Sequence, residues 1–177
     1  MSDVSSVTLP DGIAPDHAQP PPHKRRPRLL SLLILGALMI AALAGLLGGG
    51  KAPVMIASSP QADLTVHTHR VLRNGVFFET RIVIVAHVAL EDATLLLPPG
   101  LWKDMTINSF EPQATSEDFK DGAFRFHYGK LDSGDTLDLK IDGQINPPLF
   151  HGTRGYIGLA DSDQPLVSIP LRITVLP

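Results

Sequence analysis

The sequence predicts an all-β protein: an immunoglobulin-like antiparallel β-sandwich of seven or eight strands, preceded by one transmembrane α-helix. Two observations carry this prediction. Residues 29–47 form an uncharged apolar run in which Ser31 is the only polar side chain. From residue 62 to the end, apolar residues recur with a period of two, and Gly, Pro, Asp and Asn separate the short runs. This second pattern is typical of an all-β domain.

The segment before the apolar run has two parts. Residues 1–22 are polar and rich in proline, which predicts a disordered tail because few side chains there can build a core. Residues 23–28 form a basic flank that contains Lys24, Arg25, Arg26 and Arg28. Basic residues beside a membrane helix stay on the cytoplasmic side. The tail is therefore expected in the cytoplasm, and the C-terminal domain is expected outside it, anchored in the cell (inner) membrane.

The apolar run has the length of a membrane-spanning helix. Nineteen residues with a rise of 1.5 Å give a helix of about 28 Å, close to the roughly 30 Å of a hydrocarbon core. Three consecutive glycines end the run, so we assign residues 29–50 to the helix. The alternative is a cleaved signal peptide with its processing site at Ala42–Ala44. The run continues past that site, which favours a retained anchor.

Small residues recur every fourth position along this helix, at Ala37, Ala41, Gly45 and Gly49. Such a stripe lets two helices approach closely in a bilayer, so it predicts packing with a second copy of the chain or with another membrane helix. The alternative is that Ala and Gly are simply common in membrane helices.

A linker is expected at residues 51–61, followed by the extracytoplasmic domain at residues 62–177. Val76–Leu90 contains Ile82–Val85, which is apolar on both faces and predicts a central strand. Asn74–Gly75 predicts a tight turn before it, and Pro170 predicts a sheet edge or a bulge in the last strand. The other expected strands lie at 64–70, 93–97, 105–110, 124–128, 137–141, 157–159 and 167–175, with a polar loop at 111–122.

Several stretches of the domain resemble a known family. They are residues 105–112 (MTINSFEP), 126–131 (FHYGKL), 144–147 (QINP) and the segment from 158 to 177. The chain is similar here to an uncharacterised family of single-pass bacterial membrane proteins with an extracytoplasmic immunoglobulin-like β-sandwich domain. It departs from the family pattern at Pro148, where a small polar residue is usual. The resemblance implies the architecture, and it implies no activity.

Composition excludes several functions. The net charge is −3, and a mildly acidic domain with dispersed charges is a poor nucleic-acid binder, because neutralising phosphates needs a basic face. There is no cysteine, which excludes disulfides, thiolate metal sites and a cysteine nucleophile.

His67 and His69 are the best candidates for a metal site. They lie two residues apart in an expected strand, so both side chains would project from one face. Two imidazoles at this spacing can chelate Zn²⁺ or Cu²⁺, and His87, His127 or His151 would complete the site. The alternative is an ordinary solvated strand face.

Two acidic segments and three aromatic residues are weaker candidates for a binding site. Asp161–Asp163 offers carboxylates for Ca²⁺, but a turn is the preferred interpretation. Residues 117–121 are acidic and are expected to form a solvated connection between strands. Trp102, Phe110 and Tyr128 are candidates for a recognition patch, although burial in the core is the preferred interpretation.

No motif for a nucleophile, a phosphate loop or a zinc protease occurs in the sequence. The sequence therefore predicts no enzymatic activity and no cofactor; a hydrolase would need a histidine, a serine and a carboxylate to converge on folding. We expect a membrane-anchored protein that binds lipid through its helix. Its domain would bind or scaffold another envelope or membrane protein. The alternative function is an envelope metal-binding protein that uses the surface histidines.

Overall fold

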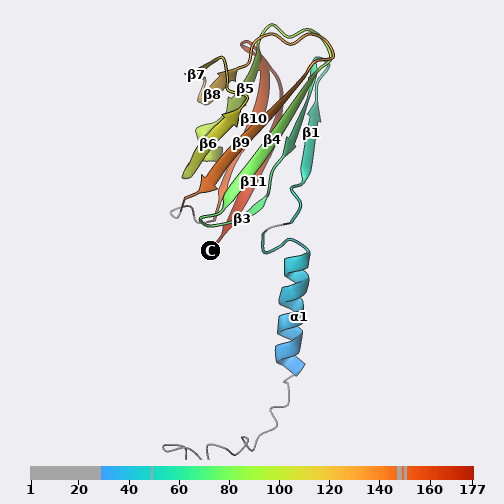
Figure 1. The fold of residues 1–177 in the computed structure, drawn as a ribbon, viewed down its shortest axis with the longest axis vertical. Coiled ribbons are helices and arrows are strands. Elements are labelled where there is room, and N and C mark those ends of the chain that lie inside the picture. Colours follow the sequence, from blue (N-terminus) through green and yellow to red (C-terminus); the bar gives the residue numbers. More distant parts are fainter. Residues whose placement is uncertain (1–28, 49, 147–148, 150) are drawn as a thin grey trace, which may run out of the picture. The chain divides into compact units, whose positions relative to one another are not determined.

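The computed structural model describes residues 29–48, 50–146, 149 and 151–177 (Figure 1). The expected tail and basic flank lie outside the described residues.

Helix α1 (Leu29–Leu43) is shorter than the helix predicted at 29–50. It ends in a Schellman motif, in which the amide of Gly45 donates to the carbonyl of Ala42 and the amide of Leu46 donates to that of Ala41. Gly45 adopts the left-handed conformation that this motif requires, with φ of 73°. The helix therefore ends earlier than expected because of one glycine inside the apolar run. A glycine can end a helix even where the apolar residues continue beyond it.

None of the helices in the described part of the chain is both long and apolar enough to span a membrane. Of the expected small-residue stripe, Ala37 and Ala41 lie on α1. Gly45 lies beyond its end, and Gly49 lies outside the described residues. Of the four small residues, only the first two are thus shown to share one face of a helix among the described residues.

The β-domain consists of two sheets. One sheet has the strand order β1 (Val54–Ser58), β2 (Ala62–His67), β4 (Phe77–Ala86), β9 (Thr136–Ile145) and β6 (Met105–Glu111). The other has the order β3 (Val71–Arg73), β11 (Gln164–Leu176), β10 (Thr153–Asp161), β5 (Ala93–Leu97), β8 (Ala123–His127) and β7 (Ser116–Lys120). A single short helix, α2 (Pro99–Trp102), follows β5.

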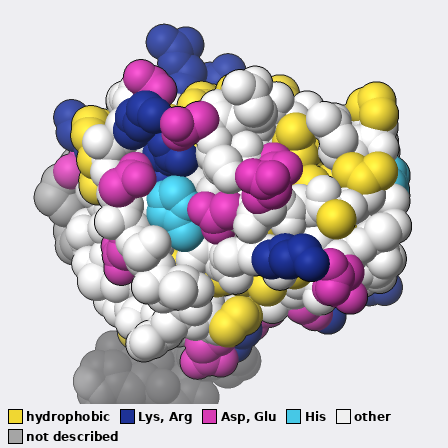
Figure 2. All heavy atoms as spheres, turned by 90° about the horizontal axis from the view of Figure 1, so that it is seen from above, with side chains coloured by type: hydrophobic (Ala, Val, Ile, Leu, Met, Phe, Trp, Pro, Cys, Tyr) yellow, Lys and Arg dark blue, Asp and Glu magenta, His cyan; other side chains and the backbone are white. Residues whose placement is uncertain are grey.

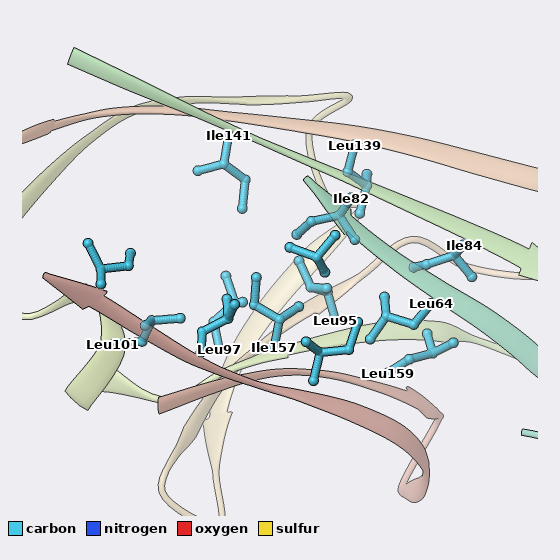
Figure 3. Packing of buried hydrophobic residues seen from close by; sticks show 14 of the residues in the cluster. Leu64, Ile82, Ile84, Leu95, Leu97, Leu101, Leu139, Ile141, Ile157 and Leu159 are labelled. Atoms are coloured by element: carbon cyan, nitrogen blue, oxygen red, sulfur yellow. The ribbon is translucent and has the colours of Figure 1, made fainter. Parts of the chain in front are cut away.

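One hydrophobic core joins the two sheets. Alternate residues of β2, β4 and β9, such as Leu64, Ile82 and Leu139, point toward Leu95 and Ile157 of the facing sheet (Figure 3). All five side chains are at most 1 % exposed. The period of two in the sequence thus marks the core face of each strand, and the prediction of an all-β protein is confirmed.

Several expected features are confirmed. Strand β4 is central, because it pairs with β2 on one side and β9 on the other. Asn74 and Gly75 form the turn before it, with Gly75 at a φ of 76°. Pro170 lies where β11 pairs only with β10, since β3 reaches β11 only at residues 174–176. A proline is tolerated there because no second strand needs its missing amide hydrogen.

Three strands were not predicted, so the described chain has eleven strands rather than seven or eight. Strand β1 lies inside the expected linker at 51–61, and its Met55 and Ala57 pack against the core. Strand β7 lies inside the expected polar loop. Strand β3 pairs with β11 in parallel, whereas an entirely antiparallel domain was expected. All three are short edge strands, and none of them has the alternation of apolar and polar residues that predicts the other strands.

Candidate functional site

The two histidines of the predicted metal site are not both in a strand. His67 is the last residue of β2, and His69 lies in the connection to β3. Both are half-buried, and the hydroxyl of Thr68 between them is hydrogen-bonded to that of Thr80 at 2.7 Å. Among the described residues, no group of three or more His, Asp or Glu side chains is arranged to hold a metal ion. Metal binding by this pair stays a prediction.

The other histidines have partners or positions of their own. His87 Nε2 lies 3.1 Å from a carboxylate oxygen of Asp63. His151 is exposed and lines a hollow at one end of the domain. His127 has the most elaborate surroundings, because it lies at the centre of a group of charged side chains.

This group, the His127 cluster, consists of His127, Asp92, Asp118, Arg125 and Asp163. His127 and Arg125 project from the same face of β8, two residues apart. Asp118 comes from β7 and Asp92 directly precedes β5, which are the two neighbours of β8 in the sheet. Asp163 lies in the turn between β10 and β11. The sheet order thus brings together residues that are far apart in the sequence.

Both ring nitrogens of His127 face carboxylates. Nδ1 lies 2.5 Å from Oδ2 of Asp92, and Nε2 lies 3.1 Å from Oδ2 of Asp118. Ionised carboxylates only accept hydrogen bonds, so both nitrogens donate when the ring is an imidazolium. The hydrogen bond to Asp92 raises the pKa of His127, against the effect of burial, and the contact with Asp118 adds to the rise.

Asp92 is held from several sides. Burial raises the pKa of its carboxyl, but hydrogen bonds from His127, from the amide of Gly129 and from Thr94 outweigh burial, and the pKa is lowered. The amide of Gly129 donates to Oδ1 of Asp92 at 2.9 Å. The carboxylate is therefore fixed in its charged form beside the charged ring.

Arg125 extends the cluster to the β10–β11 turn. Its side chain is 9 % exposed, and Nη1 donates to Oδ1 of Asp163 at 2.6 Å while Nη2 donates to the carbonyl of Ser162 at 2.9 Å. Nε lies 3.6 Å from a carboxylate oxygen of Asp118. Lys120 also donates to Asp163, at 2.9 Å. The guanidinium thus ties β8 to a turn that follows it by 38 residues.

The geometry of the His127 cluster is that of an ion-pair network. A histidine that acts as a general base needs one ring nitrogen free to take a proton from its substrate. Both nitrogens of His127 are instead engaged by carboxylates of the protein itself. What the cluster can do is fasten the edge strand β7 and the β10–β11 turn to the centre of the sheet. Acidic and basic side chains gather at this end of the domain around a histidine (Figure 2).

The remaining candidates take structural positions. Asp161 accepts hydrogen bonds from the amides of Glu91 and Asp92, and Ser162 and Asp163 form the turn that was preferred over a calcium site. Residues 117–120 form part of β7 instead of a loop connection.

The three aromatic residues pack against the core, as the preferred interpretation held. The ring of Trp102 lies 6.3 Å from that of Phe78, and Phe110 stacks on Phe126 at 4.7 Å. Burial raises the pKa of Tyr128 to about 12.

Sequence reasoning named His127 only as a further metal ligand, and it did not single out Asp92 or Arg125. The available signal was the alternation of residues 124–128, which places Arg125 and His127 on the face away from Phe124 and Phe126. Their acidic partners depend on which strands flank β8, and the pattern within one strand does not contain that information.

No family model matches the chain, and no curated protein matches it. Among solved structures, the chain is similar to two structures of the chitin-binding domain of a chitinase from Pyrococcus furiosus. The solution structure has a TM-score of 0.40 and 14 % identity, over 63 % of this chain and 98 % of that domain. The crystal structure has a TM-score of 0.39 and 15 % identity, over 64 % of this chain and all of that domain.

Proposed function

We propose that the chain is a non-enzymatic, single-pass membrane protein that presents its β-sandwich outside the cytoplasm, where the domain binds or scaffolds another envelope or membrane protein. We also propose that it belongs to the family of anchored immunoglobulin-like domains that its sequence resembles. One observation carries the proposal: an apolar run of nineteen residues stands between a basic flank and a folded β-domain.

The helix supports this proposal. None of the α1 residues is buried, although almost all of them are apolar. Large exposed hydrophobic side chains continue along its length, including Leu29, Leu33 and Ile40. Exposing so much apolar surface to water is costly, and a lipid environment removes that cost. The basic flank then sets the orientation, with the domain on the opposite side.

The absence of cysteine makes the orientation directly testable. A single cysteine is introduced either at Ser5, in the tail, or at Ser133, in the exposed turn between β8 and β9. Intact cells are treated with a maleimide that does not cross membranes. We expect Ser133→Cys to be labelled in cells with a permeable outer layer, and Ser5→Cys to be labelled only after lysis. Labelling of Ser5→Cys alone in intact cells would reverse the proposed orientation.

Retention of the anchor needs a second measurement. Membranes are extracted at high pH, and the N-terminal sequence of the mature chain is determined. We expect the chain to stay in the membrane pellet with residues 1–44 present. A mature chain that begins near Gly45 and is released by the extraction would favour the cleaved signal peptide. Immunoprecipitation from solubilised membranes then tests the binding role, and repeated recovery of the chain alone would count against it.

A further inference from the structure

The unpaired cations of the β-domain gather at one end. Among the described residues, the ion pairs engage Arg81, Lys120, Arg125, Lys130 and Lys140. None of those ion pairs includes Arg70, Arg73, Lys103, Arg154 or Arg172. Nε of Arg73 donates to the carbonyl of Leu47 at 3.2 Å, and we call the other four residues the basic band. Lys103, Arg154 and Arg172 are exposed, and so is Arg70, whose Nη2 contacts the sulfur of Met55 at 3.2 Å.

Strand pairing places these residues side by side. Arg154 of β10 lies directly opposite Arg172 of β11, and like charges at directly opposed positions repel each other. Arg70 lies close to this pair along β11, because its carbonyl accepts a hydrogen bond from the amide of Thr174, two residues after Arg172. Two arginines held in opposition without a carboxylate between them are therefore a cost to folding, and an anionic ligand would remove it.

A hollow of about 500 Å³ joins three members of the basic band. It is lined by Lys103, Arg154 and Arg172, together with His151. Among the described residues that line it, Asp104 is the only acidic one. Arginine binds phosphate through two parallel hydrogen bonds, and lysine binds it as a point charge. The donors of the hollow therefore suit a phosphate group.

The hollow lies at the end of the domain where β1 begins. Val54 at the start of β1 pairs with His67 at the end of β2, and β3 beside Arg70 pairs with the end of β11. Six residues separate Leu47, the last residue of the apolar run, from Val54. An extended chain of that length spans at most about 25 Å. Connectivity alone therefore keeps this end of the domain near the end of the apolar run.

Exposed apolar side chains lie at the same end of the domain as the basic band. Phe77, at the start of β4, is 70 % exposed, and its neighbour Val76 is exposed as well; so is Val54, the first residue of β1. Val76 lies at the same end, because its carbonyl accepts a hydrogen bond from the amide of Ile145 at the end of β9. Basic residues beside exposed apolar and aromatic ones are typical of surfaces that contact a bilayer.

The opposite end of the domain has the opposite character. The connections there carry Glu91, Asp92, Asp132, Asp135, Asp161 and Asp163. Figure 2 views this end and shows Asp and Glu side chains gathered on it, with Lys and Arg side chains among them. Acidic residues outnumber basic ones at this end, where Lys120 and Arg125 pair with Asp163 and Lys130 pairs with Asp132, whereas the other end carries the basic band. An acidic surface is repelled by anionic lipid, so only the basic end is suited to face a membrane.

We infer that the basic band binds the phosphate groups of anionic lipids at the outer face of the membrane in which the chain is anchored. The membrane in this inference rests on the proposed function, whereas phosphate binding rests on the hollow itself. Binding would relieve the repulsion between Arg154 and Arg172 and would hold the domain with its acidic end away from the lipid.

The test uses the full chain purified in a neutral detergent. Binding of short-chain phosphatidylglycerol is measured by native mass spectrometry, with phosphatidylcholine and inorganic phosphate as separate probes. Arg154→Gln with Arg172→Gln removes two charges from the basic band. Arg81→Gln with Lys140→Gln removes the same charge from paired positions elsewhere, and circular dichroism confirms that both variants are folded.

We expect the chain to bind phosphatidylglycerol in preference to phosphatidylcholine. The Arg154/Arg172 variant should bind it at least tenfold more weakly, and the Arg81/Lys140 variant should bind it within twofold of the original chain. Equal losses in the two variants, or no binding by the original chain, would overturn the inference. Binding of inorganic phosphate alone would overturn the choice of lipid as the ligand.

The cysteine-labelling experiment separates this inference from the proposed function. If the lipid binds at the basic band but Ser133→Cys is labelled only after lysis, the proposed orientation fails while phosphate binding stands. If the labelling is as expected and the lipid does not bind, the proposed function stands and the inference fails.

Discussion

At the scale of single residues, Arg125 and Arg81 form similar ion pairs in different surroundings. The Arg125 side chain is 9 % exposed, and that of Arg81, paired with Asp138, is 55 % exposed. Water competes little for the hydrogen bonds of a buried guanidinium, so their loss is costly. An exposed ion pair contributes little to the free energy of unfolding.

We therefore predict that Arg125→Met lowers the free energy of unfolding by about 1.5–3 kcal/mol, and that Arg81→Met has a much smaller effect. Chemical denaturation of the full chain in neutral detergent, followed by circular dichroism, measures both. Equal losses would show that burial of Arg125 does not decide its contribution.

His127 makes the stability depend on pH in a defined direction. The folded state raises the pKa of His127, first through its hydrogen bond to Asp92. This stabilisation is fully present below the pKa of an unfolded histidine, near 6.5, and it is lost as the pH rises through the higher folded value. Asp92 has a lowered pKa. Its contribution is present above the unfolded value near 3.8 and is lost as the pH falls through the lower folded value.

We predict that the melting temperature of the chain falls between pH 6 and pH 9 and that His127→Gln removes most of this fall. The matched control is His87→Gln, because His87 pairs with Asp63 at a more exposed position. Melting curves at several pH values give the result. A slope that is unchanged in His127→Gln would assign the pH dependence to other groups.

These residues also show where sequence reasoning stops. The alternation of residues 124–128 correctly places His127 and Arg125 on the same face of a strand. Asp92 lies 35 residues before His127, and only the order β10-β5-β8-β7 places it there. A charged partner on a neighbouring strand leaves no periodic signal in its own segment, so the cluster could not be predicted.

At the scale of elements, hydrophobic pattern predicts the strands that build the core. Strands β2, β4 and β9 alternate between core and surface, and they were expected within a few residues of where they are found. Strand β7 is exposed at every position and has no such pattern. The end of α1 was missed for a related reason: Gly45 ends the helix through its conformation, while Leu46 and Leu47 continue the apolar run.

The start of β10 offers a test of backbone packing. Gly152 has a φ of 93°, and a Cβ at this position would lie 1.8 Å from the carbonyl oxygen of Ile173. Gly134 has a similar φ of 91° but has nothing within 4 Å of such an atom. The two positions share the conformational penalty of a positive φ, and only Gly152 adds a collision with the neighbouring strand.

We predict that Gly134→Ala costs about 1–2 kcal/mol of stability and that Gly152→Ala costs clearly more, because β10 and β11 must move apart. Denaturation of both variants under identical conditions measures the difference. A loss for Gly152→Ala no larger than that for Gly134→Ala would show that the strands separate there at little cost.

At the scale of the whole molecule, the boundary of the folded domain has a practical consequence. The expected domain began at residue 62, but β1 starts at Val54 and covers the edge of β2 over five residue pairs. Met55 and Ala57 of β1 also pack against the core. A fragment without β1 therefore loses apolar burial and exposes a strand edge that is open to pairing with other chains.

We predict that a fragment of residues 52–177 is monomeric and unfolds cooperatively. A fragment of residues 60–177 should melt at least 10 °C lower and should form larger species, because the exposed edge of β2 can pair between molecules. Calorimetry and size-exclusion chromatography of the two fragments, with the full chain in detergent as reference, measure both effects. Identical melting temperatures would mean that β1 adds nothing to the domain, and the boundary would return to residue 62. The longer fragment would otherwise define the unit that the membrane anchor carries.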